Sequence, residues 1–389
     1  MRKNWEYKKF KDVFNLQMGK TPDRKNYDLF QGSNIWVSIR DLGDKYISSS
    51  NEYISDKAAS NIKMVPKGTV IMSFKLSIGK CAIAAKDLYT NEAIMAFNIK
   101  DGHDIDSSFL YYYLQGHNSA YASKAEQGIT LNISTLSKQI IGIPPKSTQL
   151  AIVAELDKLN EMIRLKKQQL EDYDQLAQSI FYEMFGDPVE NEKEWEVKKL
   201  GEVCIDITDG DHMPPPKASK GIPFITISNI NKETRELNFE NTFFVSEEYY
   251  NNLKDNRKAR LGDLLYTVTG SYGIPVTVET NIPFCFQRHI ALIRPKQNVL
   301  STKYLCFWVL CENVKSMADR AATGIAQKTV GLNTIRNFMV ILPPLPLQQQ
   351  FAARIEAIEQ QKQQVKDMIK DLETLLASRM QYWFDFTPD

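Results

Sequence analysis

Histidine and cysteine, which build most metal centres and many nucleophilic sites, are scarce in this sequence. Four of its 389 residues are histidine and five are cysteine. Cys306 and Cys311 lie in a segment with helical periodicity, and no histidine stands at metal-ligand spacing from them. We therefore expect reduced, buried thiols, as in a cytosolic protein, and no metal site.

Long apolar runs and an excess of either charge are also missing. No stretch approaches the roughly 20 apolar residues of a membrane-spanning helix, and no apolar signal core follows Met1–Trp5. Lys and Arg number 48 against 47 Asp and Glu, for a net charge of +1. Such a balance does not suit a chain that coats nucleic acid alone, but it allows small basic patches on one face. We expect a cytoplasmic protein without a membrane partner.

Three kinds of catalytic motif are incomplete. Gly19-Lys20-Thr21 ends like a phosphate-binding loop, but Phe14 stands where that loop needs its first glycine. None of the Pro-Pro sites carries the leading Asn or Asp and the trailing aromatic residue of an amino-methyltransferase loop. Glu196-Val197-Lys198 fits a nuclease tripeptide, but it belongs to a repeated segment. The sequence therefore predicts no catalytic residue, and no cofactor is expected to be bound by this chain.

What the sequence does contain is an internal repeat. Its matching segments recur in the same order: Trp5–Phe10 with Trp195–Leu200, Gly68–Ile71 with Gly262–Leu265, Ile143-Pro144-Pro145 with Leu342-Pro343-Pro344, and Gln149 with Gln348. A globular part plus a long helix, repeated in tandem, predicts a pseudo-two-fold molecule with two similar surfaces.

Each repeat ends in a long segment with a heptad pattern. Positions 148–185 and 347–384 contain no internal Gly or Pro, and about 38 residues give roughly 57 Å of helix. The predicted seam comprises Ile152, Leu156, Leu159, Ile163, Leu170, Tyr173, Ile180, Ile355, Ile358, Val365, Ile369, Leu372 and Leu376. We expect the two helices to pair antiparallel as an intramolecular coiled coil. The alternative is that each helix packs on its own globular part.

The globular parts, 1–147 and 187–344, combine short strands with one amphipathic helix each. Strands are predicted at Thr69–Phe74 and Leu264–Val268, and helices at Ser107–Tyr121 and Thr302–Arg320. This mixture indicates an α+β fold, with two similar mixed α/β domains and a pair of long helices.

Polar and basic residues cluster in loops at equivalent places of the two repeats. Lys and Arg suit phosphate and guanine, Asn and Gln suit adenine, and Ser and Thr suit either kind of contact. The candidate DNA-binding residues are Lys20, Thr21, Arg40, Lys75, Lys80, Thr130, Asn132, His212, Lys217, Thr226, Ser228, Asn229, Thr269, Ser271, Tyr272, Arg288, His289, Gln327 and Lys328. Each alone is more often an ordinary surface residue. Their clustering in both repeats is what indicates nucleic-acid binding.

The order of these motifs resembles the DNA-specificity subunit of type I restriction–modification enzymes. The segments that carry the resemblance are Thr208–His212, Gly221–Ile230, Gly262–Gly273, Gln287–Leu292 and Pro343–Gln350. The first repeat has weaker versions in Met18–Pro22, Pro144-Pro145 and Gln149, and it shows Thr90–Ala93 in place of Gln287-Arg288-His289. Contact residues are therefore carried over with less support in the first repeat.

The resemblance implies two target-recognition domains, 1–147 and 187–344, with long helices at 148–186 and 345–389. Each domain would read one half of a bipartite site in double-stranded DNA, and the helices would set the spacer. The implied partners are two modification subunits, which methylate DNA, and restriction subunits. S-adenosylmethionine, ATP and Mg²⁺ are expected on those partner subunits, and this chain would be non-catalytic. Two alternatives remain: a coiled-coil scaffold that displays two protein-binding domains, and the detached recognition part of a fused methyltransferase-nuclease.

Overall fold

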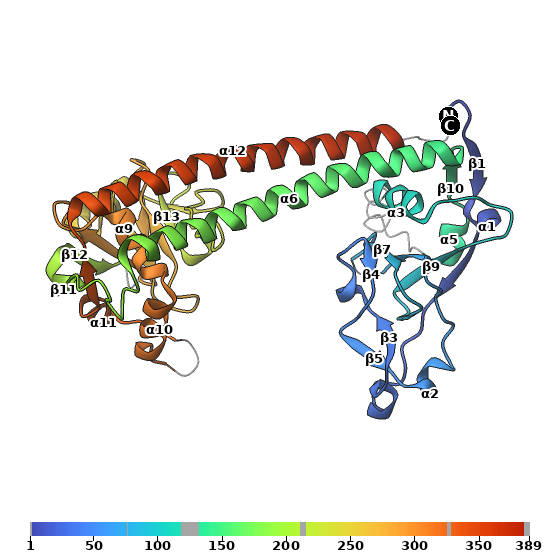
Figure 1. Cartoon of the computed structure of the whole chain (residues 1–389), viewed down its shortest axis with the longest axis horizontal. Coiled ribbons are helices and arrows are strands. Elements are labelled where there is room, and N and C mark those ends of the chain that lie inside the picture. Colours follow the sequence, from blue (N-terminus) through green and yellow to red (C-terminus); the bar gives the residue numbers. More distant parts are fainter. Residues whose placement is uncertain (1, 76, 118–131, 211–214, 325–327, 385–389) are drawn as a thin grey trace. The chain divides into compact units, whose positions relative to one another are not determined.

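The computed structural model describes residues 2–75, 77–117, 132–210, 215–324 and 328–384. The chain divides into two compact units: unit 1 is Met1–Lys167 with Asp367–Asp389, and unit 2 is Gln168–Lys366. Each unit holds one globular domain and one part of each long helix, α6 (Lys146–Phe185) and α12 (Leu345–Phe384) (Figure 1). Domain 1 is the part of unit 1 that precedes α6, and domain 2 is the part of unit 2 between α6 and α12. The division therefore cuts through both helices, whereas the sequence pattern predicts each helix as a separate segment.

The described residues of domain 1 form three sheets. The strands β1 (Glu6–Lys9) and β10 (Ile140–Ile143) pair antiparallel next to α6. A five-stranded sheet has the order β2 (Phe14–Met18), β9 (Ile94–Ile99), β6 (Val70–Ser73), β7 (Cys81–Ala84) and β4 (Tyr46–Ile47). A three-stranded sheet has the order β5 (Glu52–Ile54), β3 (Asn34–Val37) and β8 (Tyr89–Thr90), and Figure 1 shows it at the end of the domain away from α6. The short helices are α1 (Phe10–Val13), η1 (Tyr27–Phe30), η2 (Ile39–Asp41), α2 (Asp56–Ala59), α3 (Ser107–Gly116) and α5 (Ile133–Ser137).

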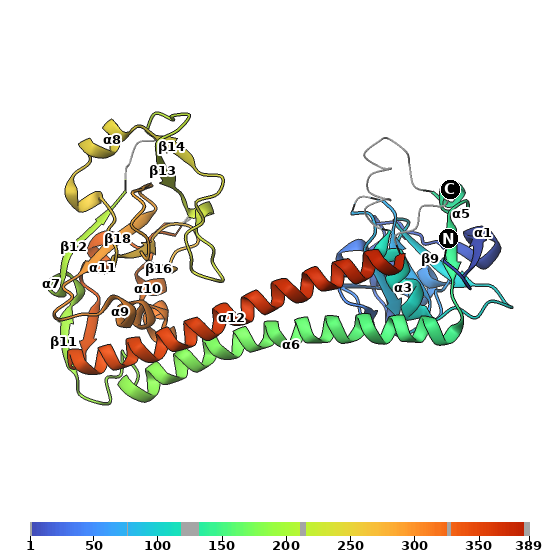
Figure 2. The same ribbon diagram turned by 90° about the horizontal axis from the view of Figure 1, so that it is seen from above.

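Domain 2 repeats this plan. The strands β11 (Glu196–Lys199) and β19 (Met339–Leu342) pair antiparallel. The larger sheet has the order β12 (Cys204–Asp209), β18 (Ile290–Pro295), β15 (Leu264–Thr267) and β16 (Pro275–Thr277). The smaller has the order β14 (Phe243–Val245), β13 (Ile222–Ile225) and β17 (Cys285–Phe286). The short helices are α7 (Leu200–Val203), η3 (Ile227–Asn229), α8 (Glu247–Asn252), η4 (Asp255–Arg257), α9 (Thr302–Leu310), α10 (Glu312–Ala321) and α11 (Leu332–Arg336). Figure 2 shows α8 and β14 at the end of the domain away from α12.

The predicted helix Thr302–Arg320 is wrong as a single element, because it is broken at Cys311. Cys311 has an extended backbone, with φ −62° and ψ 137°, and separates α9 from α10. Nearly every side chain of α9 is buried, whereas α10 buries only one side. The break at Cys311 changes the direction of the chain, so that α9 can be buried on nearly all sides while α10 keeps one side in solvent. In domain 1, α3 begins at the predicted Ser107 and ends at Gly116.

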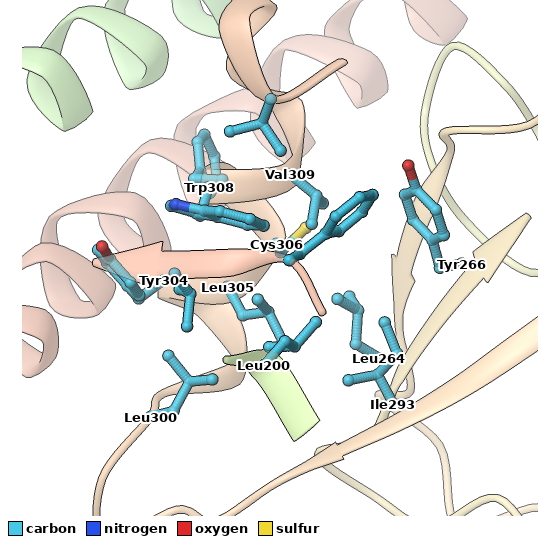
Figure 3. Close-up of a cluster of buried hydrophobic side chains, with 14 of the residues drawn as sticks. Leu200, Leu264, Tyr266, Ile293, Leu300, Tyr304, Leu305, Cys306, Trp308 and Val309 are labelled. Carbon is cyan, nitrogen blue, oxygen red and sulfur yellow. The ribbon is translucent and has the colours of Figure 1, made fainter. Parts of the chain in front are cut away.

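The core of domain 2 forms where α9 covers the larger sheet. Trp308, Tyr304 and Leu305 of α9 are fully buried, and they pack with Leu264 of β15 and Leu200 of α7 in one apolar cluster (Figure 3). Burying large apolar side chains against a sheet removes them from water, which is the main favourable term in folding. The sheet edges and turns beyond this cluster are thereby held on a rigid base.

The long helices run antiparallel where they meet within each unit. In unit 2, Asp174 accepts from Lys362 Nζ at 2.8 Å, and the ring of Phe181 lies 5.6 Å from that of Phe351. In unit 1, Lys167 Nζ donates to Glu373 at 2.9 Å, and Glu155 pairs with Arg379. The residue numbers of the contacts decrease along α12 as they increase along α6, as antiparallel pairing requires.

The predicted seam residues differ in burial. Eight are at most 9% exposed: Ile152, Leu156, Leu159, Ile163, Ile355, Ile358, Val365 and Ile369. The other five are partly exposed: Leu170, Tyr173, Ile180, Leu372 and Leu376. Ile152 and Leu156 also belong to the core of domain 1, and Ile355 and Ile358 to that of domain 2. The two predicted alternatives, pairing of the helices and packing of each helix on its domain, thus occur together.

A buried glutamine joins each long helix to its domain. Gln149 Oε1 accepts from Asp106 N at 2.8 Å, and its Nε2 donates to Pro144 O at 3.0 Å. Gln348 Oε1 accepts from Ser301 N at 2.9 Å, and its Nε2 donates to Pro343 O at 2.8 Å. The two glutamines are 1% and 0% exposed. This pairing explains why the Pro-Pro motif and the following glutamine recur together. The helix α6 begins at Lys146, directly after Pro145.

Candidate nucleic-acid interface

Three loops of domain 2 meet beside the ends of β12 and β15. Val268 N donates to His289 O at 2.9 Å, and Val330 N donates to Val268 O at 2.9 Å. Gly270 N donates to Lys328 O at 3.1 Å. These bonds tie the β15–β16 turn to the β17–β18 turn and to residues 328–330. The predicted contact residues Thr269, Arg288, His289 and Lys328 are thereby brought together.

The loops enclose a shallow hollow of about 340 Å³. Its lining residues are Asp209, Val268, Thr269, Arg288, His289, Thr329, Val330, Gly331 and Leu332. A guanidinium, an imidazole, two hydroxyls and the carboxylate of Asp209 therefore line one space, and all of these groups except the carboxylate are of the kinds that contact phosphates and guanine edges.

Gly210 allows the end of β12 to approach this hollow. A Cβ at Gly210 would lie 1.9 Å from Phe286 O, closer than any real side-chain atom can come. In domain 1, a Cβ at Gly19 would lie 2.1 Å from Thr90 O. Both positions need glycine because the backbone passes so close to the neighbouring strand.

The charges in the hollow are set by Arg288 and its neighbours. Arg288 is exposed, and its Nε donates to His289 Nε2 at 3.4 Å. Burial, with the adjacent Arg288 charge, lowers the pKa of His289 below its ordinary value of 6.5. The imidazole is therefore neutral at neutral pH and can accept as well as donate. The carboxylate of Asp209 is partly offset by Arg257, whose Nη2 lies 3.5 Å from it.

The other candidates of domain 2 have diverse environments. Asn229 is 7% exposed, and its Oδ1 accepts from Thr226 N at 3.0 Å and from Thr226 Oγ1 at 2.8 Å, so it closes a turn. Ser228 is exposed on that turn. The side chains of three more candidates meet other residues: Ser271 accepts from Lys232 at 2.8 Å, Tyr272 donates to Asp319 at 2.7 Å, and the Lys217 ammonium lies 5.1 Å from the Phe243 ring centre.

Domain 1 places its candidates around the equivalent turns. Lys20 N donates to Thr90 O at 2.9 Å, and Lys80 N donates to Ser73 Oγ at 3.0 Å. The side chains of Lys20, Lys75 and Lys80 are exposed. Thr21 donates to Glu92, at the turn between β8 and β9. These candidates therefore lie at the ends of β2, β6 and β7.

Arg40 and Asn132 lie on other elements of domain 1. Arg40 is exposed in η2. The Asn132 side chain accepts from Thr135 N at 3.0 Å and caps α5. Thr130, His212 and Gln327 fall outside the described residues, so their predicted contacts stay predictions, as do those of the candidates above.

Sequence reasoning missed three polar residues at these turns. Asp209 and Thr329 line the hollow of domain 2, and Glu92 bonds to Thr21 in domain 1. Thr329 directly follows the candidate Lys328, and Asp209 lies inside the segment Thr208–His212. Including the neighbours of Lys328 would have found Thr329, and including every polar residue of that segment would have found Asp209. Glu92 lies in Thr90–Ala93, the segment that stands in place of Gln287-Arg288-His289, but it was missed because no acidic residue was considered as a contact residue.

The cysteines take no part in a reactive site. All five are buried and free. Burial raises the pKa of both Cys306 and Cys311 to about 11, so neither is a thiolate nucleophile at neutral pH. Over the described ranges, no group of three or more His, Cys, Asp or Glu is placed to hold a metal ion. Within the same residues, no helix has the length and apolar character needed to cross a membrane.

Comparisons with known proteins agree with this arrangement. The type I restriction modification DNA specificity domain matches residues 2–172 and again 192–374. The MjaIX specificity subunit of Methanocaldococcus jannaschii, a type I restriction enzyme subunit, is 27% identical over 92% of this chain and 87% of its own length. The EcoBI specificity subunit of Escherichia coli is 23% identical over 64% of this chain and 58% of its own length.

Solved structures share the fold. A chain from a study of complex assembly and conformational transition of the type I R-M system matches with a TM-score of 0.65 and 20% identity, over 99% of this chain and 98% of its own length. The S subunit of a type I restriction-modification system from M. genitalium matches with a TM-score of 0.51 and 16% identity, over 99% of this chain and 97% of its own length. The chain therefore belongs to the family of type I restriction–modification DNA specificity domains, of which it carries two in tandem.

Proposed function

We propose that this chain is the sequence-specific DNA-recognition subunit of a type I restriction–modification complex, and that each domain reads one half of a bipartite site. The observation that carries this proposal is the repetition of one set of converging turns with different side chains. In domain 2 the β17–β18 turn exposes Arg288 next to the partly buried His289, whereas in domain 1 the β8–β9 turn exposes Glu92 next to the buried Ala93. The same backbone turns with different side chains would let the two domains read two different half-site sequences.

The partners we propose are DNA, two modification subunits and the restriction subunits. The catalytic motifs for nucleotide hydrolysis and methyl transfer are incomplete in this sequence. S-adenosylmethionine, ATP and Mg²⁺ would therefore act on the partner subunits, and this chain would be their non-catalytic guide. The five free cysteines fit the reducing cytoplasm in which such a complex would work.

We further propose that α6 and α12 set the spacer between the half-sites. Each has 40 residues. An α-helix has a fixed rise per residue, and the antiparallel contacts within each unit hold the two helices together. A pair of packed helices resists bending better than a single helix, so the length of the pair would keep the distance between the two half-sites constant.

Methylation mapping tests the proposal directly. The full chain is co-expressed with its modification subunits in a host without other adenine methylation, and modified positions are mapped across the genome. We expect one bipartite motif that is lost when this gene is omitted and unchanged when the restriction subunits are omitted. Methylation without a defined motif, or the same motif without this chain, would refute the assignment.

A scaffold that displays two protein-binding domains is the rival function. Binding of the purified complex to target and non-target duplexes separates the two. A recognition subunit gives affinity that falls steeply with salt and is much higher for the target duplex. A scaffold gives no difference between the duplexes.

A further inference from the structure

The β8–β9 turn of domain 1 and the β17–β18 turn of domain 2 share one backbone hydrogen-bond pattern. Ala93 O accepts from Phe74 N at 3.0 Å, as His289 O accepts from Val268 N at 2.9 Å. Two further bonds match: Asn91 N to Val37 O at 3.0 Å with Gln287 N to Ile225 O at 3.1 Å, and Ile94 N to Asn91 O at 3.2 Å with Ile290 N to Gln287 O at 3.0 Å. Glu92 therefore occupies in domain 1 the place that Arg288 occupies in domain 2.

The neighbouring β6–β7 turn of domain 1 supports the same equivalence. Gly79 N donates to Ser73 O at 2.8 Å, and the Ser73 hydroxyl donates to Ser77 O at 2.5 Å. In domain 2, Gly273 N donates to Thr267 O at 2.9 Å, and the Thr267 hydroxyl donates to Ser271 O at 2.8 Å. Two adjacent turns thus correspond bond for bond, so the exchange of Glu for Arg occurs within one conserved geometry.

Glu92 is held ready to accept a hydrogen bond. Its side chain is exposed, and the Thr21 hydroxyl donates to its Oε2. That bond, with help from the charges of Lys75 and Arg24, lowers the pKa of Glu92 below its ordinary value. The group is therefore a carboxylate at neutral pH. A carboxylate accepts about four hydrogen bonds and donates none, so Thr21 fixes the group while leaving most of its capacity.

The surroundings of Glu92 let a carboxylate approach DNA. Lys20, Lys75 and Lys80 are exposed at the same turns, and Thr21 follows Lys20 directly. Lysines on phosphates offset the repulsion between one carboxylate and the backbone of the duplex. The three lysines would bind the phosphates of DNA of any sequence, and the single carboxylate could discriminate between bases.

The bases differ in what they offer to such an acceptor. In the major groove, guanine presents only acceptors, thymine presents an acceptor and a methyl group, and adenine presents an acceptor beside its amine. Cytosine presents a single donor, the N4 amine. We propose that Glu92 is a specificity-determining residue of domain 1 that accepts a hydrogen bond from N4 of a cytosine in the half-site read by that domain. This inference rests on the proposed DNA-recognition function, and it gives the two domains opposite preferences at one shared position.

The test uses Glu92→Gln in the full chain, assembled with its modification subunits. The matched control is Glu6→Gln, which also removes one exposed carboxylate from unit 1. Methylation rates are measured on duplexes in which each base pair of the target is changed in turn. At one C·G pair, we expect the wild type and Glu6→Gln to prefer cytosine by about tenfold or more, the discrimination typical of a good base contact. Glu92→Gln should reduce that preference below about threefold and leave the other half-site unchanged.

Several outcomes would overturn the inference. One is an unchanged motif in Glu92→Gln, and another is relaxation at an A·T pair. A third is an equal loss of rate on all duplexes, which would show a general role in folding or phosphate binding. If the wild-type complex itself methylates no bipartite motif, the proposed function fails, and the inference fails with it. That last result is distinct from the others because it is seen in the wild type.

Discussion

Arg294 and Asp263 form a two-point ion pair in the interior of domain 2. Arg294 Nε lies 2.9 Å from Asp263 Oδ1, and Arg294 Nη2 lies 2.8 Å from Asp263 Oδ2. The residues are 7% and 2% exposed. Two further bonds hold the pair in place: Arg294 Nη2 donates to Lys258 O, and Arg260 N donates to Asp263 Oδ2. At the corresponding places of the repeat, domain 1 has Thr69 and Asn98, so this pair belongs to domain 2 alone.

Removing one partner of this pair should strongly destabilise unit 2. Asp263→Ala leaves a buried guanidinium without its counter-charge, a change that typically costs about 3–5 kcal/mol. The measurement is the urea midpoint of the purified chain. Asp255→Ala, which breaks the exposed pair with Arg260, is the control and should change the midpoint little. Equal urea midpoints for the two variants would show that the buried pair stabilises the fold no more than the exposed pair does.

Gln348→Ala should loosen the start of α12. The substitution leaves the partly buried Ser301 N–H without its acceptor, and leaving a buried polar group unsatisfied costs up to about 1–3 kcal/mol. We expect lower stability and faster amide exchange at residues 345–352. Gln349→Ala, on the exposed neighbour, is the matched control. If both variants exchange at the wild-type rate, the bonds of Gln348 do not anchor the helix.

The helices and the repeat could be predicted from the sequence because their signals are local. Heptad spacing and the Pro-Pro pairs place helices that the structure begins at Lys146 and Leu345. A break such as that at Cys311 has no comparable signal, because both flanking segments favour helix and only their packing differs.

The candidate interface was harder to predict because it depends on side-chain direction. Ser228 and Asn229 are adjacent and both polar. Ser228 is exposed, whereas the Asn229 side chain is turned inward and accepts a hydrogen bond from Thr226 N. Loop composition cannot separate them. The sequence places Thr90–Ala93 opposite Gln287-Arg288-His289, but only the backbone hydrogen bonds show that Glu92 takes the place of Arg288.

Arg288→Ala should affect one half-site and not the other. If Arg288 contacts a base, its loss costs about 1–3 kcal/mol of binding and relaxes one position of the motif. Binding of the assembled complex to duplexes altered in one half-site at a time measures this. Lys296→Ala removes an exposed cation of the same domain and serves as the control. Equal weakening for both half-sites would contradict a base contact.

His289 should make domain 2 less stable below neutral pH. Its pKa in the folded state lies below the ordinary 6.5, so the unfolded chain takes up a proton first as the pH falls. The contribution is complete above about pH 6.5 and is lost as the pH falls through the folded-state pKa. His289→Gln should lose less stability than the wild type between about pH 7 and pH 5. NMR titration of the four histidines should also show that Arg288→Ala raises the His289 pKa. A folded-state pKa at the ordinary value would remove this dependence of stability on pH, and one above it would reverse the sign.

Lengthening the helices should lengthen the DNA spacer. Inserting four residues after Leu165 in α6, with four matched residues after Lys370 in α12, adds about 6 Å of helix. Four residues are close to one helical turn, so each domain keeps nearly its original rotational phase. With about 3.4 Å per base pair, we expect methylation mapping to show a spacer longer by about two base pairs, with both half-sites unchanged. Leu165→Ala, at a position 51% exposed, keeps the helix length and should keep the spacer. A longer helix with the original spacer would mean that something other than these helices sets the distance.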